Sequence, residues 1–196
     1  TVVMEPTTEN RSWGIFSAVG PSTPVKRMGI NFGAPGDRKD QSGREWFGYP
    51  RPSTRERLEY VFDIKHRIAA GGGWYSRNEQ SVDVDGTDSP WLYTSGGRGL
   101  TRFELPLISQ GQPPAKYTVR LHFADMENEP PTALDVHLQG TKVSTGIRIK
   151  ADAGSNRAHI EEFPDVEVDQ NLLVELTPDD DRSLTTLSAI EVIRQE

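Results

Sequence analysis

The sequence predicts an all-β protein, a β-sandwich or jelly roll of mostly antiparallel strands with few or no long helices. Several short segments alternate apolar and polar residues, which is the pattern of a strand with one face in a core and the other in water. The 196 residues include 18 glycines and 14 prolines, enough for many turns. No segment of twelve or more residues has the periodicity of an amphipathic helix, and this combination is typical of sandwiches.

The clearest strand lies at 116–128. Its alternating apolar positions are Tyr117, Val119, Leu121 and Phe123. The alternation stops at Ala124, and Asp125, Glu127 and Asn128 then open a polar loop. We expect this segment to be a central strand that presents acceptor-rich side chains at one end of the sandwich, where such folds place binding sites.

Other strands and turns follow from the same reasoning. Strands are expected at 25–32, 58–65, 90–95, 100–107, 134–139, 172–176 and 187–193. Breaks or turns are expected at the glycine-rich stretches 71–73, 96–99 and 140–141, with 142–143 pairing back as a hairpin. A helix is the alternative for the region of 58–65, because 53–56 resembles a capping box.

Composition excludes several classes of partner. The net charge is −7 and no long run of lysine or arginine is present, so nucleic acid is not an expected partner. No apolar run approaches the roughly 20 residues of a membrane span. The absence of cysteine rules out disulfides, thiol catalysis and thiolate zinc sites.

Residues 1–25 are expected to form an N-terminal arm or a linker from a preceding domain, and 26–196 the β-sandwich. The arm contains Trp13 and Phe16, which we expect to pack onto the sandwich, since two exposed aromatic residues favour aggregation. Because the chain begins with Thr1, it is interpreted as a piece of a longer protein.

The order of motifs at 30–33, 90–93, 117–125, 134–140 and 187–192 resembles the malectin-like domain family over roughly 26–194. This resemblance implies a lectin-type jelly roll that binds carbohydrate, tethered to a catalytic or propeller domain in an extracellular or periplasmic protein. Two sugar-stacking aromatic residues of malectin follow the Ala-acidic step, where this chain has Glu127 and Asn128. The family's aspartate corresponds to one of 179–181, with Asp180 as the candidate.

A sugar site needs aromatic rings for the C–H faces of the sugar and polar groups for its hydroxyls. The candidate residues are Trp46, Tyr49, Trp74, Tyr75, Tyr93, Asp125, Glu127, Asn128 and Asp180. Trp74 and Tyr75 form the most lectin-like pair, although a loop folded onto a sheet edge would explain them too. A core plug under the loop 33–45 is the alternative for Trp46, and solvated turns are the alternative for the acidic residues.

No cofactor is expected, apart from a structural calcium ion that is left open. Asp83, Asp85 and Asp88 alternate around Gly86 and would suit Ca²⁺, but the complete twelve-residue loop is missing and a solvated turn is the default. His122 and His137 are expected on the polar faces of neighbouring strands, as a metal pair or, preferably, a solvent-facing couple.

The favoured function is therefore a non-catalytic carbohydrate-binding module. The first alternative is a structural or protein-interaction domain that has lost sugar binding, because the aromatic pair is missing at 127–128. The least supported alternative is a polysaccharide-cleaving enzyme with Asp125 and Glu127 as its acid/base pair. The chain contains no G-x-S-x-G, H-E-x-x-H or P-loop motif.

Overall fold

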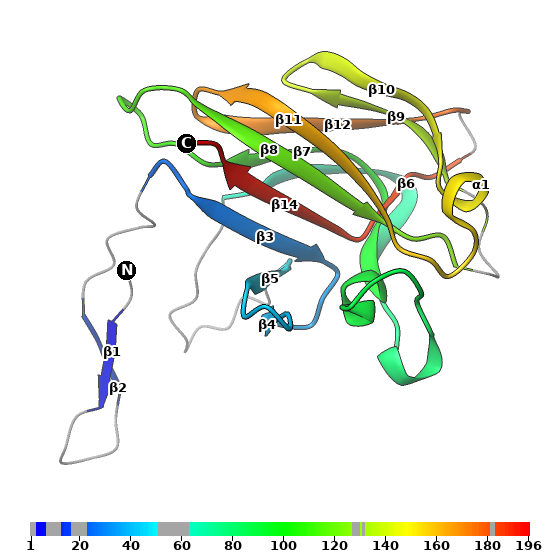
Figure 1. Ribbon diagram of the computed structural model, residues 1–196, viewed down its shortest axis with the longest axis horizontal. Coiled ribbons are helices and arrows are strands. Elements are labelled where there is room, and N and C mark those ends of the chain that lie inside the picture. Colours follow the sequence, from blue (N-terminus) through cyan, green and yellow to red (C-terminus); the bar gives the residue numbers. More distant parts are fainter. Residues whose placement is uncertain are drawn as a thin grey trace.

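A computed structural model describes residues 3–6, 13–16, 23–50, 63–126, 130, 132–180 and 183–196. In this part of the chain, two six-stranded sheets lie face to face, and a separate two-stranded sheet is formed by β1 (Val3–Pro6) and β2 (Trp13–Phe16) (Figure 1). The predicted all-β sandwich is confirmed. Residues 58–62 of the strand predicted at 58–65, the capping-box segment 53–56, Glu127 and Asn128 lie outside the described residues.

The first sheet contains the predicted central strand. Its order is β11 (His159–Val168), β8 (Ala115–Phe123), β14 (Ala189–Arg194), β3 (Arg27–Phe32), β5 (Glu45–Tyr49) and β4 (Arg38–Lys39). All neighbours pair antiparallel except β3 and β5, which are parallel. Strand β8 pairs on one side with the edge strand β11 and on the other with β14, so it is an interior strand that lies one position in from the edge of the sheet rather than at its centre.

The second sheet contains the predicted hairpin. Its strands are β10 (Thr141–Arg148), β9 (Ala133–Leu138), β12 (Asn171–Pro178), β7 (Ser95–Pro106), β13 (Thr186–Leu187) and β6 (Lys65–Ser76). Strands β9 and β10 pair antiparallel around Gln139 and Gly140, both of which have positive φ. Strands β6 and β13 both pair with β7.

The core lies between the two sheets, and the alternation of β8 predicts which of its residues enter it. Tyr117, Val119, Leu121 and Phe123 are fully buried and share one cluster with residues of the opposite sheet such as Phe103. A smaller buried cluster, which includes Trp46 and Tyr93, contains residues from the loops that flank the first sheet. Helical structure in the described residues is limited to α1 (Ile149–Ala153) and the short 3₁₀ turns η1 (Glu79–Ser81) and η2 (Pro90–Tyr93).

Three local predictions are wrong, and two of them share one cause. The glycines at 71–73 and 96–99 do not end strands but lie inside β6 and β7. Gly71 and Gly99 have positive φ, and the pairing of the two strands is interrupted between Ile68 and Gly73, so the glycines form an irregular, bulged ladder. The third wrong prediction is the strand at 90–95. The structure has the 3₁₀ turn η2 there, and its first residue is a proline.

Candidate functional site

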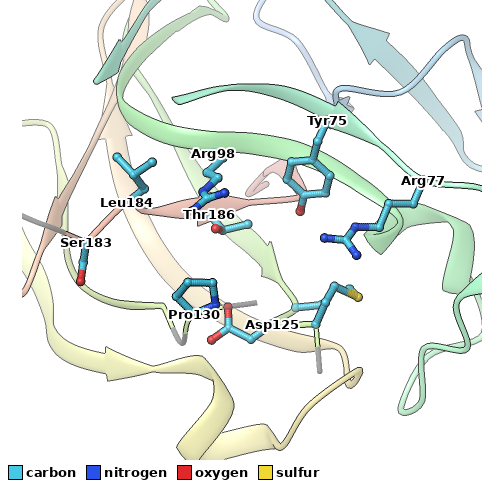
Figure 2. A pocket seen from close by; sticks show the side chains of 10 residues that line it. Tyr75, Arg77, Arg98, Asp125, Pro130, Ser183, Leu184 and Thr186 are labelled. Carbon is cyan, nitrogen blue, oxygen red and sulfur yellow. The ribbon is translucent and has the colours of Figure 1, made fainter. Parts of the chain in front are cut away.

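A pocket of about 170 Å³ lies beyond the C-terminal end of β8, and we call it the end pocket (Figure 2). Its described lining is Tyr75, Arg77, Arg98, Ala124, Asp125, Met126, Pro130, Ser183, Leu184 and Thr186. These residues come from β6, β7, the segment after β8 and the segment around β13. The fold therefore brings together four parts of the chain that are distant in sequence.

Tyr75 forms an aromatic wall of the end pocket, and glycine in the neighbouring strand makes its position possible. Tyr75 of β6 pairs with Gly96 of β7. A Cβ atom added at Gly96 would lie 2.6 Å from the Tyr75 hydroxyl oxygen and 2.8 Å from the Leu187 carbonyl oxygen. The ring therefore lies directly over the backbone of β7, a close approach that only glycine permits.

Trp74 faces the other way, because successive side chains of a strand point to opposite faces of the sheet. Its ring stacks on Phe32 with a centroid separation of 5.8 Å and an interplanar angle of 14°, and it contacts Tyr49 and His66 edge-on. The predicted Trp74–Tyr75 pair is thus divided between the sandwich interior and the end pocket. Tyr49 belongs to the interior group as well, since its hydroxyl donates to the Ile64 carbonyl oxygen at 3.1 Å.

Asp125 lies at the base of the pocket and is only 3% exposed. Its Oδ2 accepts a hydrogen bond from the Thr132 backbone N–H at 2.6 Å. Burial raises the pKa of the Asp125 carboxyl, while hydrogen bonds from Thr132 and from the Lys150 backbone act in the opposite direction. The carboxylate therefore connects the end of β8 to the start of β9 and holds the pocket in shape.

Two arginines missed by the sequence analysis also line the pocket. Arg77 follows Tyr75 by two positions, and its backbone N–H donates to the Thr94 carbonyl oxygen at 2.9 Å, which extends the β6–β7 pairing beyond Ser76. Its guanidinium lies 5.9 Å from the Tyr75 ring centroid and points into the pocket (Figure 2). Arg98 reaches the pocket from β7, beside Thr186, with which it pairs across the sheet.

Asp180 does not line the end pocket but supports one side of it. Its two carboxylate oxygens accept hydrogen bonds from the backbone N–H of Ser183 at 2.9 Å and from the Ser183 hydroxyl at 2.8 Å. These hydrogen bonds hold Ser183, which lines the pocket together with Leu184 and Thr186, against Asp180.

Trp46 and Tyr93 line a second hollow of about 850 Å³ on the outer side of the first sheet, which we call the outer cleft. Trp46 is 3% exposed, and its indole N–H donates to Asp40 Oδ2 at 3.3 Å, so it is a plug beneath the loop 33–45. The Tyr93 hydroxyl is buried and lies 2.9 Å from His122 Nδ1. Both rings are therefore held by internal contacts.

Most charged groups in the lining of the outer cleft form ion pairs, either with one another or with Arg27 beside the cleft. Glu191 is 2% exposed and forms ion pairs with Arg27, Arg44 and Arg120, and Arg120 also pairs with Glu162 at 2.5 Å.

A carboxylate and an imidazole in the outer cleft have displaced pKa values. Burial alone would raise the pKa of Asp40, but hydrogen bonds from Ser42, Arg44 and Trp46 outweigh it and lower this pKa to about 2. Burial lowers the pKa of His122 to about 4, so the ring is neutral at pH 7. Within the described structure, the buried Nε2 of His122 has no hydrogen-bond partner.

The histidine pair proposed from the sequence is wrong. His122 lies on β8 and His137 on β9, which belong to different sheets, and His122 is buried against Tyr93 rather than facing solvent. Alternation shows on which face of a strand a residue lies, but not which strands become neighbours.

The predicted calcium ligands lie in an irregular segment. Asp85 is held by its backbone, whose N–H donates to Asn156 and whose carbonyl accepts from Ala158, both at 2.9 Å. The Asp88 carbonyl oxygen accepts from Gln41 at 3.2 Å. Over the described ranges, no three His, Asp or Glu side chains gather in a way that could hold a metal ion. Calcium at Asp83, Asp85 and Asp88 stays a prediction.

Comparison with known protein families finds no matching family, and no curated protein matches the sequence. Solved structures do match in fold. A β-glucuronidase from Bacteroides uniformis matches with a TM-score of 0.64 and 12% identity, over 87% of this chain and 18% of that chain. The extracellular domain of ANXUR2 from Arabidopsis thaliana matches with a TM-score of 0.63 and 12% identity, over 86% of this chain and 48% of that chain.

A third match is the plant receptor-like kinase FER, with a TM-score of 0.59 and 15% identity, over 86% of this chain and 49% of that chain. At these identities the likeness establishes the fold alone. The chain spans between 18% and 49% of these three structures, so this β-sandwich occurs elsewhere as one part of a longer protein. In the described residues, no helix has the length and apolar character needed to cross a membrane.

Proposed function

We propose that the domain is a non-catalytic carbohydrate-binding module of malectin-like type and that the end pocket is its sugar site. One observation carries the proposal: the pocket combines the Tyr75 ring with the hydrogen-bonding side chains of Arg77, Arg98 and Thr186. A ring provides apolar area for the C–H face of a sugar, and the polar groups fix its orientation. A pocket of about 170 Å³ suits a single sugar unit of a longer glycan.

The comparisons support this proposal at the level of fold and setting. One structural match is a glycosidase and another is an extracellular domain. We infer that this domain, too, acts outside the cell, attached to a catalytic or propeller domain whose substrate it holds nearby. A single small site binds weakly, and tethering raises its effective affinity.

A binding role is favoured over glycoside cleavage because of the carboxylates. Cleavage takes two carboxyl groups about 5–9.5 Å apart across the sugar. Asp125 is the one carboxylate in the described lining, and its Oδ2 already accepts the Thr132 backbone N–H. Asp125 therefore supports the pocket structurally, and the sugar is held by the wall that contains Tyr75.

A protein-interaction scaffold is the second candidate, and one feature of the sequence favours it. The two positions at which the resemblance places sugar-stacking rings are occupied by Glu127 and Asn128. In the proposed site, Tyr75 supplies an aromatic surface from a different strand, so the loss of those rings changes the sugar specificity without removing the site.

Titration calorimetry of the 196-residue chain against glucans and plant and marine polysaccharides, with product analysis, tests the proposal. Tyr75→Ala is expected to weaken sugar binding at least about tenfold, which corresponds to 1.4 kcal/mol of lost contact. Tyr49→Phe is the matched control, because Tyr49 is an aromatic residue of the interior group and should leave the affinity unchanged.

Three results would contradict the proposal. Binding to none of the glycans would favour the scaffold role. Reducing ends or unsaturated products that accumulate with time would show an enzyme. Sugar binding that is unchanged in Tyr75→Ala would mean that the site lies elsewhere.

A further inference from the structure

We propose that the outer cleft is a second binding site, which takes a neutral, hydroxyl-rich ligand such as a segment of an uncharged glycan chain. The cleft has a volume of about 850 Å³ against about 170 Å³ for the end pocket, so it has room for more than one sugar unit. The described linings of the two hollows share no residue. The inference therefore goes beyond the proposed function and does not depend on the end pocket.

The first argument is that internal hydrogen bonds hold the walls of the cleft. One wall is the loop between β4 and β5, in which the Asp40 carboxylate accepts from the Ser42 backbone N–H at 2.9 Å and from the Ser42 hydroxyl at 2.6 Å. A second wall is the segment 86–89, and the Gln41 side-chain amide joins the two walls by donating to the Asp88 carbonyl oxygen at 3.2 Å. A site with fixed walls loses little conformational entropy when a ligand binds.

The second argument is the state of Arg44, which lies on the first wall. Its side chain is 47% exposed, and it forms ion pairs with Asp40 at 3.8 Å and with Glu191 at 3.7 Å. Both distances are too long for a hydrogen bond. With respect to the described residues, the five N–H donors of this guanidinium are therefore available to the oxygen atoms of a ligand.

The third argument concerns the charge of the ligand. The described lining contains more carboxylates than arginines, and this remains true when Arg27 beside the cleft is included: the carboxylates are Asp40, Asp88, Glu162 and Glu191, and the arginines are Arg44 and Arg120. An excess of negative charge disfavours an anion, and the Arg44 guanidinium disfavours a cation. A hydroxyl group both accepts and donates, so a neutral polyol can bond to Arg44 and to the exposed carboxylate of Glu162.

The fourth argument is the apolar surface that Ile160 adds to the cleft. Ile160 is 49% exposed, and Val143 is the other exposed large apolar residue in the described part of the chain. Ile160 of β11 pairs with His122 of β8, so the two side chains lie on the same face of the first sheet, and both line the outer cleft. An exposed aliphatic side chain within a polar cleft gives the C–H groups of a sugar a surface to pack against.

Neutral hexasaccharides test the inference on the intact chain, and NMR chemical shifts of backbone amides report the two hollows separately. The probes are cellohexaose, laminarihexaose, xylohexaose and mannohexaose. At least one of them should shift the amides of 42–44 and 160–162 in the wild type, and also in Tyr75→Ala, which lacks the aromatic wall of the end pocket. An oligogalacturonate of the same length should bind at the outer cleft about fivefold or more weakly.

Two variants test the residues that carry the proposal. Arg44→Gln and Ile160→Ser should each weaken binding at the outer cleft about fivefold or more. Arg67→Gln and Val143→Ser are the matched controls, because they change an exposed arginine and an exposed apolar residue outside both hollows, and they should leave the affinity unchanged. Thermal unfolding of each variant verifies that the fold is retained.

The outcomes separate this inference from the proposed function. Shifts confined to the end pocket would overturn the inference and leave the proposed function intact. Shifts confined to the outer cleft would support the inference and refute the end pocket as the sugar site. Binding at the cleft that is unchanged in both Arg44→Gln and Ile160→Ser, or oligogalacturonate that binds there as tightly as the neutral probes, would overturn the inference. Shifts at neither hollow would overturn both proposals.

Discussion

Replacing Gly96 with alanine is expected to destabilise the protein and to displace the aromatic wall of the end pocket. The new methyl group would lie 2.6 Å from the Tyr75 hydroxyl oxygen and 2.8 Å from both the Tyr75 Cζ and the Leu187 carbonyl oxygen. Ordinary contacts to carbon are about 3.5–4.0 Å, so the ring has to move by about 1 Å. Overpacking of this kind costs about 1–3 kcal/mol.

Gly73→Ala in the same strand as Tyr75 is the matched control, with the opposite expected sign. A Cβ atom at Gly73 meets nothing within 4 Å, and its φ does not lie in the left-handed region. Alanine there restricts the unfolded chain and should stabilise the protein by about 0.4–1 kcal/mol. Urea unfolding measures both variants, and calorimetry with the best-binding glycan should show about tenfold weaker binding for Gly96→Ala alone.

A double mutant identifies the origin of the effect. In a Tyr75→Ala background, the cost of Gly96→Ala should fall, because only the contact with the Leu187 carbonyl oxygen is left. If Gly96→Ala is as stable as Gly73→Ala and binds sugar as well as the wild type, the ring is not held against β7 and the account of the pocket is refuted.

Three further predictions concern the residues that support the sheets. Glu191→Gln should lower the free energy of unfolding by about 1–3 kcal/mol in urea titrations, since it removes the buried carboxylate on which the half-buried Arg27 and Arg120 converge, whereas Glu162→Gln, an exposed partner, should cost less than about 1 kcal/mol. Because burial lowers the pKa of His122 to about 4, below its usual 6.5, the unfolded chain is protonated first as the pH falls. Stability should therefore drop by roughly 3 kcal/mol between pH 6.5 and 4, and His122→Gln should flatten this dependence in urea titrations across that range. Asp125→Ala leaves the Thr132 N–H without its acceptor and should cost about 1–3 kcal/mol in the same titrations, with weaker sugar binding in calorimetry; an unchanged stability would contradict its supporting role.

Much of the strand framework could be predicted because strand alternation is a local property. The apolar positions of β8 are the buried ones, and the hairpin of β9 and β10 turns at Gln139 and Gly140 as expected. The glycines of β6 and β7 were misassigned as breaks for a physical reason. Glycine permits a turn, but it also permits the close approach of a ring, and the sequence does not show which of the two is used.

The candidate site was predicted only in part. Tyr75 and Asp125 do line the end pocket, whereas Tyr49 and Trp74 belong to the interior aromatic group. Arg77 had a usable signal, because it follows Tyr75 at the spacing of one strand face. Arg98 had no usable signal in the sequence, because the glycines on both sides of it predict a turn.

The sequence by itself determined that this chain forms a β-sandwich, because alternation and turn residues act over a few neighbours. Only the tertiary structure decided which surfaces meet. Strand pairing places Tyr75 over Gly96 and brings Arg98 beside Thr186, a residue 88 positions further along the chain (186 − 98). A binding pocket depends on such long-range register, and register is set by the packing of the whole sandwich rather than by any one segment.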